Sequence, residues 1–187
     1  GMKKAFSVAR QFDPENSGIL YFQGRQNLAE MNWNEATAAF KKMKHSEALD
    51  LVNRLKPLSA MSLLENMDEI VSHLDHPISE YFLLNLMNSR LTLKEKTQCY
   101  RWYLKVSHRG LAHLPKLEVQ AYKGGTEVIL RDELAIKNPG PLYLLNPVKV
   151  DLFNSAIIYP ESLNECDSLE ELSLQKTGVL GAGNLKI

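Results

Sequence analysis

The chain has 187 residues, which is enough for one domain or two small ones with a buried core. Lysine plus arginine and aspartate plus glutamate number 22 each, so no overall charge attracts nucleic acid or an acidic membrane. No apolar run approaches the roughly 20 residues of a membrane-spanning helix, and the start lacks the apolar core of a signal peptide. The two cysteines, Cys99 and Cys166, have no metal-ligand spacing and favour a reducing, cytoplasmic setting over a disulfide framework.

The residues before about position 45 have helical patterns. Residues 2–14 are expected to form either a short helix or a loose arm. Apolar residues then recur at helical spacing over 17–31. A further helix is predicted to start after Asn32 or Asn34, because either side chain can cap it.

Three residues of this region have the spacing of a known helical motif. Gly24, Ala36 and Phe40 lie twelve and four residues apart, and this spacing resembles that of a tetratricopeptide helical hairpin. Residues 34 further on do not repeat the pattern. The resemblance therefore implies one helical hairpin.

Start and stop signals predict four more helices before residue 110. They begin at Ser46, at the Ser62-Leu-Leu-Glu65 capping box, near Ile78 and at the Thr92-Leu-Lys-Glu95 capping box. The third of these has little polar face, so it should be the most buried. Short connections between so many helices indicate an all-α bundle or superhelix over residues 1–109.

The stretch from residue 139 to residue 179 repeats itself with a period of 21 to 22 residues. Within it, Val150-Asp-Leu152 aligns with Leu172-Ser-Leu174. A period of this length is typical of a solenoid unit. Alternating leucines in such a unit point to one side of a short strand and pack against neighbouring units.

The second copy, residues 169–179, resembles the leucine-rich repeat pattern, with Thr177 where that family usually has Asn or Cys. The resemblance implies a parallel sheet in a short β-solenoid over residues 110–187. We therefore expect an α+β chain with two domains, 1–109 and 110–187. Chance agreement between two amphipathic stretches is the alternative reading of the repeat.

A third copy of the leucine ladder lies at 111–119. It precedes the next copy by more than one period, so it requires an insertion. The Gly124-Gly125 pair and residues 126–130 fit that insertion as a turn and an irregular strand. The helix before this copy is expected to cover the open edge of the solenoid.

The leucine-rich repeat resemblance also implies which residues face a partner protein. These are Lys149, Asp151 and Phe153 in one copy, Glu171, Ser173 and Gln175 in the next, and Lys116, Glu118 and Gln120 in the third. Phe153 is the expected anchor, because an aromatic side chain between charged residues is typical of interface hot spots. Alanine at both Asp151 and Phe153 is expected to abolish binding without unfolding the protein.

An enzyme is the alternative hypothesis. Its site would lie between the helical and β regions and use Cys99, His108, His113 and Glu133. The five histidines lack a metal-binding motif and cluster at predicted helix ends, where terminal carbonyls favour a cation. We therefore expect no metal and no other cofactor.

Nucleic-acid binding is the other alternative. Basic residues interleave with Tyr100, Trp102 and Tyr103 over 90–109, and such a mixture can hold phosphates and stack bases. The same mixture also fits a solvated helix face with its aromatic rings turned inward, and the neutral charge of the chain favours this interpretation. The sequence thus predicts a non-enzymatic, cytoplasmic protein that binds another protein.

Overall fold

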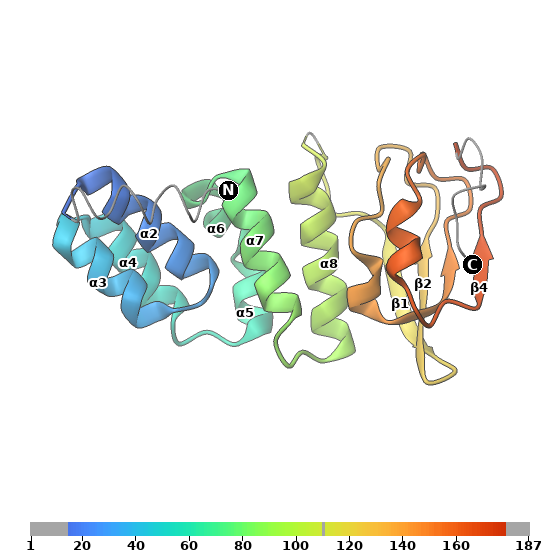
Figure 1. The fold of residues 1–187 in the computed structure, drawn as a ribbon, viewed down its shortest axis with the longest axis horizontal. Helices are drawn as coiled ribbons and strands as arrows, with labels where there is room; N and C mark the ends of the chain where they lie inside the picture. Colours follow the sequence, from blue (N-terminus) through green and yellow to red (C-terminus); the bar gives the residue numbers. More distant parts are fainter. Residues whose placement is uncertain (1–14, 110, 179–187) are drawn as a thin grey trace. The chain divides into compact units, whose positions relative to one another are not determined.

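The computed structural model describes residues 15–109 and 111–178 (Figure 1). The fold is α+β, as expected, with helices followed by a small sheet. The chain divides into two compact units, one up to Leu86 and the other from Met87. The division differs from the boundary expected at Arg109, because the last helix packs on the sheet. The arm or helix expected over 2–14 lies outside the described residues.

The described part of the first unit is helical. Its helices are α2 (Ser17–Ala29), α3 (Trp33–Met43), α4 (Ser46–Leu55), α5 (Ala60–Glu65), α6 (Met67–His73) and α7 (His76–Met87), which ends at the boundary between the units. The expected burial of α7 is confirmed at Phe82 and Leu83, which are both fully buried.

Helices α2 and α3 pack closely where Gly24 meets Phe40. A Cβ atom at Gly24 would lie 2.5 Å from the Phe40 ring, so only glycine allows this approach. Phe40 is 1% exposed, and Ala36 on the same helix is fully buried. The three residues singled out by their spacing thus lie in one helix interface, and the family resemblance itself stays a prediction.

The capping box predicted at Ser62 is wrong. Helix α5 begins earlier, because the Ser59 hydroxyl accepts a hydrogen bond from the Ser62 backbone N–H at 3.2 Å. Ser62 is therefore already helical, and the next helix, α6, begins after Asn66. The apolar spacing of this region predicts a core stripe of Leu64, Met67, Ile70, Val71 and Leu74. All of them are buried except Val71, which is half-buried.

The second unit begins with α8 (Leu93–Ser107), whose predicted capping box is confirmed. The Thr92 hydroxyl accepts from the Glu95 N–H, and the Glu95 carboxylate accepts from the Thr92 N–H at 2.8 Å. The Thr92 hydroxyl also donates to the Glu95 carboxylate at 2.7 Å, and this bond, followed by the one from the Thr92 N–H, lowers the pKa of Glu95. Farther along α8, the Arg101 guanidinium donates to the Leu117 carbonyl at 2.9 and 2.6 Å, which ties the helix to the first strand.

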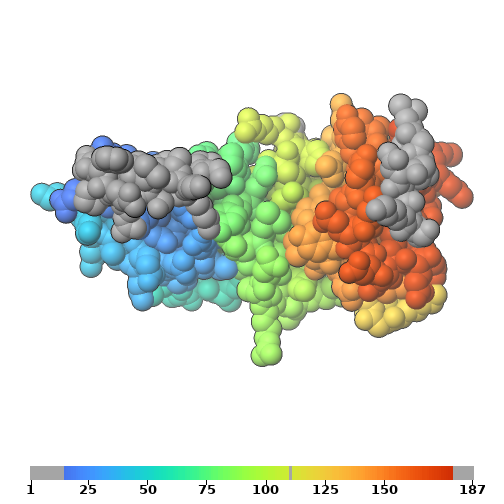
Figure 2. All heavy atoms as spheres, in the orientation of Figure 1, coloured from blue at the N-terminus to red at the C-terminus, as the bar shows by residue number. Residues whose placement is uncertain are grey.

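Among the described residues, four strands form one open sheet in the order β1-β2-β3-β4. They are β1 (Leu117–Tyr122), β2 (Gly125–Leu130), β3 (Pro147–Asp151) and β4 (Glu171–Ser173), with short 3-10 helices η1 (Leu142–Leu145) and η2 (Glu161–Glu165) on the connections. Strands β1 and β2 form an antiparallel hairpin, whereas β2, β3 and β4 are parallel. Figure 2 shows the turn of this hairpin, in yellow, at the surface.

The parallel strands follow one another at a spacing of 22 residues. Val128 pairs with Val150, and Val150 pairs with Leu172, which confirms the register expected for the last two copies. The prediction for the copy before them is wrong. The strand of that copy is β2, which the sequence pattern assigned to an insertion, and the strand expected there instead, β1, runs antiparallel. The solenoid itself stays a prediction.

The turns after the three parallel strands also match. Asp132, Asn154 and Lys176 each have a positive φ, of 59°, 52° and 57°. The Asp132 N–H donates to the carbonyl of Phe153, and the Asn154 N–H donates to that of Gln175. The backbone pairing of the sheet therefore continues into the loops that follow the strands.

Candidate functional site

The sheet has one buried face and one face with polar side chains, because successive residues of a strand point to opposite sides. Val128, Leu130 and Val150 lie on the buried face and are at most 1% exposed. We call the other side the outer face. It carries Glu118, Gln120 and Tyr122 of β1, Glu127 and Ile129 of β2, Lys149 and Asp151 of β3, and Glu171 and Ser173 of β4.

A row of alternating charges crosses the outer face. The Lys149 ammonium lies 2.9 Å from a Glu127 carboxylate oxygen and 3.9 Å from one of Glu171. The hydrogen bond to Glu127 raises the pKa of Lys149, and the same bond lowers the pKa of Glu127. Two of the predicted partner-binding residues are therefore already paired within the sheet.

The end of β1 and the hairpin turn that follows it add two residues that the sequence pattern did not single out. The Tyr122 hydroxyl donates to Glu171 at 2.8 Å, and the Lys123 ammonium lies 2.8 Å from the same carboxylate oxygen. The pKa of Glu171 is lowered first by Lys123 and then by Tyr122. The sequence places these two residues between two strand-like segments but gives no sign of their contact with β4, because β1 and β4 lie far apart along the chain.

Asp151 is a structural carboxylate of the sheet. It is 6% exposed and binds the Arg131 guanidinium, the Phe153 N–H at 3.0 Å and the Ser173 side chain. Burial alone would raise the pKa of Asp151, but the bonds from Arg131 and Phe153 outweigh it and lower that pKa. This placement argues against the expectation that alanine at Asp151 leaves the fold intact.

The remaining predicted residues lie where the parallel strands end. Phe153 is half-buried, and the Lys176 ammonium lies 5.2 Å from its ring centre, within range of a cation–π contact. Gln175 is exposed. The neighbouring loop carries Leu134, which is 70% exposed. We call Arg131, Leu134, Phe153, Gln175 and Lys176 the strand-end surface, because their loops are hydrogen-bonded side by side.

The residues assigned to the third copy are divided. Glu118 and Gln120 are exposed on the outer face, and the Gln120 amide donates to Glu127. Lys116 is exposed too, but it precedes β1, and its backbone N–H donates to the buried carboxylate of Glu133. The structure thus joins Gln120 to the charged row and leaves Lys116 outside it.

The alternative enzyme site gains no support from its residues. Cys99 is fully buried, and burial raises the pKa of its thiol to about 12. The Glu133 carboxylate is occupied by a backbone N–H, and the His108 ring nitrogen Nδ1 lies 3.1 Å from the Leu104 carbonyl. Among residues 15–109 and 111–178, no group of three His, Cys, Asp or Glu side chains is placed to hold a metal ion.

We expect the two thiols to react slowly with a thiol reagent in the folded protein. Cys99 and Cys166 are buried, and burial raises their pKa values to about 12 and about 11, so little thiolate exists near pH 8. Release of thionitrobenzoate from Ellman's reagent, with and without urea, measures the rate at which the thiols react. Rapid native labelling of Cys99 would contradict its burial and restore the enzyme hypothesis.

The basic helix α8 turns its aromatic rings inward. Tyr100 is fully buried and its hydroxyl donates to the Pro139 carbonyl, and Trp102 is 6% exposed with the Lys105 ammonium 4.5 Å from its ring centre. This confirms the interpretation as a solvated face with internal aromatics at these two positions. Neither ring is free to stack on a base.

Comparison of the chain with protein-family models, with curated proteins and with solved structures finds no match. In the part of the chain that the structure describes, no helix has the length and apolarity needed to cross a membrane. The functional argument therefore depends on the residues and their geometry.

Proposed function

We propose that this protein is a non-enzymatic interaction module that binds a partner protein through the strand-end surface and the adjoining outer face. The observation that carries the proposal is Phe153. Its half-buried ring is held by Lys176 beside the exposed Leu134 loop. An aromatic side chain fixed between charged neighbours has the character of an interface hot spot.

We further propose that residues 125–178 form a short solenoid of the leucine-rich repeat type. Three parallel strands at equal spacing, with matching turns, support this. The turn residues behave alike as well: the Ser155 hydroxyl donates to the Leu152 carbonyl at 2.8 Å, and the Thr177 hydroxyl donates to that of Leu174 at 2.7 Å. Helix α8 packs on β1, and β1 pairs with β2, so α8 and β1 together would cap the first copy.

The paired charges of the outer face fit a binding surface that is ordered in advance. Glu127, Lys149 and Glu171 hold one another in place, so little side-chain freedom remains to be lost when a partner binds. Affinity would then come from the apolar contacts at Phe153 and Leu134, and the charged row would select the partner. The thiols of Cys99 and Cys166 are buried and not joined in a disulfide, which supports a reducing, cytoplasmic location.

We expect Phe153→Ala to weaken partner binding at least about tenfold, as at other aromatic hot spots. The measurement is a pull-down from lysate of the source cell, quantified by mass spectrometry, with wild type and variant compared. Tyr159→Ala is the matched control, because Tyr159 is an aromatic residue that is 54% exposed and lies outside the proposed surface. Circular dichroism checks that both variants are folded.

Partners retained by wild type and Tyr159→Ala but lost with Phe153→Ala would support the proposed surface. Equal capture by a folded Phe153→Ala variant would count against it. Loss with Tyr159→Ala alone would move the binding surface to the loop between β3 and η2, which carries Tyr159.

A further inference from the structure

Strand β4 lies at one edge of the sheet. Among the described residues it pairs with β3 alone, because it stands last in the strand order. The backbone of an edge strand offers N–H and C=O groups that can pair with another strand, and proteins commonly protect such an edge with a proline, a bulge or charged side chains. Strand β4 has no proline, and its register with β3 runs without a bulge. Its protection therefore depends on its charges.

The hydrogen bonds between β3 and β4 show which backbone groups face the open edge. The Ser173 carbonyl accepts from the Leu152 N–H at 2.9 Å, so Ser173 directs its backbone towards β3. Backbone groups of successive residues point to opposite sides of a strand, so Leu172 and Leu174 direct theirs away from β3. The Leu174 carbonyl accepts from the Thr177 N–H in the following turn. Leu172 thus brings both a donor and an acceptor to the edge.

The leucine side chains of this last copy are incompletely covered. Val150 and Leu152, one repeat earlier, are fully buried, whereas Leu172 and Leu174 are only half-buried. Val150 pairs with Leu172, so the two side chains point to the same face of the sheet. They differ in burial because β3 has a described strand on each side and β4 has one on a single side. A further strand at this edge would bury more apolar surface, which favours pairing.

The acidic side chains at β4 are neutralised within the chain. The Glu171 carboxylate accepts from the Tyr122 hydroxyl at 2.8 Å and lies 2.8 Å from the Lys123 ammonium. The Lys149 ammonium lies 3.9 Å from the same carboxylate, and Lys123 also lies 3.8 Å from the carboxylate of Glu170. Charges that would otherwise repel a second strand are therefore balanced by lysines of their own chain.

We propose that the open edge of β4 pairs with the same edge of a second copy of this chain, antiparallel, about a two-fold axis at Leu172. The Leu172 N–H of each copy donates to the Leu172 carbonyl of the other, because a residue with both groups at an edge is its own complement under this symmetry. The two Leu172 side chains then lie opposite each other. Each Glu171 lies opposite Ser173 of the other copy, so no like charges face each other directly.

This pairing goes beyond the function proposed above. It uses the edge of β4 and needs only the purified chain, so it can fail or succeed independently of partner binding at Phe153.

The test measures self-association of the full chain and locates it. Analytical ultracentrifugation should show a dimer with a dissociation constant of about 0.1 mM, because two short strands bury less area than a standard interface. Amide hydrogen exchange by NMR, at about 20 μM and about 1 mM protein, should show the Leu172 N–H slowed about threefold in the concentrated sample, since pairing protects it. Exchange of the Leu152 N–H, which donates to Ser173 within the chain, should not change.

Leu172→Pro and Leu172→Val form a matched pair. Proline lacks the N–H that faces the second copy but is tolerated in an edge strand, so Leu172→Pro should weaken dimerisation at least about tenfold. Valine keeps the N–H and fits a strand, so Leu172→Val should dimerise within about threefold of wild type. Slow exchange of the Leu152 N–H in Leu172→Pro shows that β3 and β4 still pair.

Three results would overturn the proposal. They are a wild-type chain that stays monomeric at about 1 mM, a folded Leu172→Pro variant that dimerises as wild type does, and a dimer whose Leu172 N–H exchanges freely. If proline unfolds β4, the exchange of the Leu172 N–H in wild type decides.

Discussion

Asp151→Ala is expected to lower the free energy of unfolding of the sheet unit by about 3 kcal/mol. The carboxylate is 6% exposed and accepts from the backbone of Phe153, from Ser173 and from Arg131. Removal of the carboxylate leaves the Phe153 N–H and the Ser173 side chain without their acceptor. The Arg131 side chain is more than half exposed and can bind water instead, so the loss of its ion pair contributes little to the destabilisation.

Hydrogen exchange of β3 and β4, together with urea unfolding, measures the loss of stability in Asp151→Ala. Asp167→Ala is the matched control, because that carboxylate is exposed, and a change within about 0.5 kcal/mol is expected. Unchanged exchange of β3 in Asp151→Ala would show that the buried carboxylate does not stabilise the sheet.

The contribution of Asp151 should also depend on pH. Its pKa in the folded protein lies below the ordinary value of 3.8, so its stabilisation is present above that value and is lost as the pH falls through the folded pKa. The difference in unfolding free energy between wild type and Asp151→Asn should therefore be constant from neutral pH down to about 5 and shrink below about 4. A difference that is the same at pH 7 and pH 2 would contradict a role for the charge.

Local signals in the sequence predict local structure well. The Thr92 box is correct because both of its hydrogen bonds lie within four residues of chain. The error at Ser62 is also local, since Ser59 takes the capping position three residues earlier. The buried positions were still predicted correctly at Leu64, Met67 and Ile70, because apolar spacing indicates them independently of where the helix starts.

Pairing between distant strands was predicted only where the repeat is clear. Val150 and Leu172 pair as aligned. The strand β2 was expected only as an irregular strand in an insertion, because Glu133 occupies the turn position that holds Ser155 and Thr177 in the later copies. The signal was present, since Val128-x-Leu130 precedes Val150-x-Leu152 by one period.

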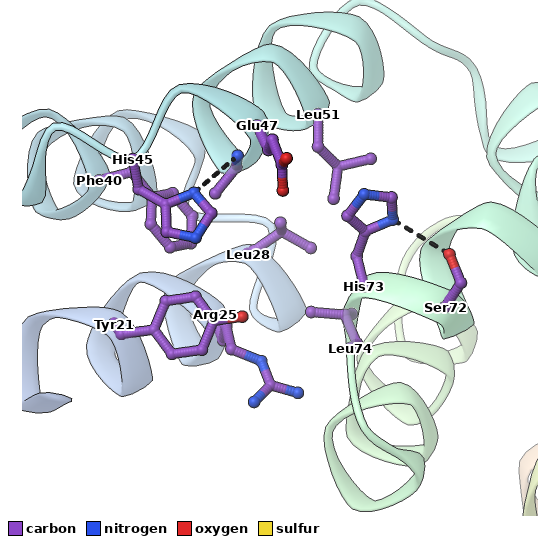
Figure 3. Close-up of a pocket in the computed structure, with 11 residues that line it drawn as sticks. Tyr21, Arg25, Leu28, Phe40, His45, Glu47, Leu51, Ser72, His73 and Leu74 are labelled. Atoms are coloured by element: carbon purple, nitrogen blue, oxygen red, sulfur yellow. Dashed lines mark hydrogen bonds between the residues drawn. The ribbon is translucent and has the colours of Figure 1, made fainter.

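Side-chain partners are harder to predict than strands. Pattern alone made Asp151 an outward-facing charge, as its place in the strand requires, but it could not show that Arg131 and Ser173 cover it. His45, for example, was expected at a helix end where terminal carbonyls favour a cation, whereas its ring accepts a hydrogen bond at the start of α4 (Figure 3).

Gly24→Ala is expected to destabilise the first unit by about 2 kcal/mol, although alanine favours a helix by about 1 kcal/mol over glycine. The added methyl group would lie 2.5, 2.7 and 2.9 Å from three carbons of the Phe40 ring. That ring is 1% exposed and cannot move into solvent, so α2 and α3 must separate. Urea unfolding and hydrogen exchange of α2 and α3 measure the effect.

The comparison that isolates the contact is a double-mutant cycle with Phe40→Leu. A shorter side chain makes room for the methyl group, so the double variant should be more stable than the sum of the single changes predicts, by at least about 1 kcal/mol. Gly18→Ala in the same helix is the matched control. Among the described residues, its Cβ would meet only the Asn16 side-chain oxygen, at 3.2 Å, so a change within about 0.5 kcal/mol is expected. Additive effects of Gly24→Ala and Phe40→Leu would show that the two helices do not meet at this pair.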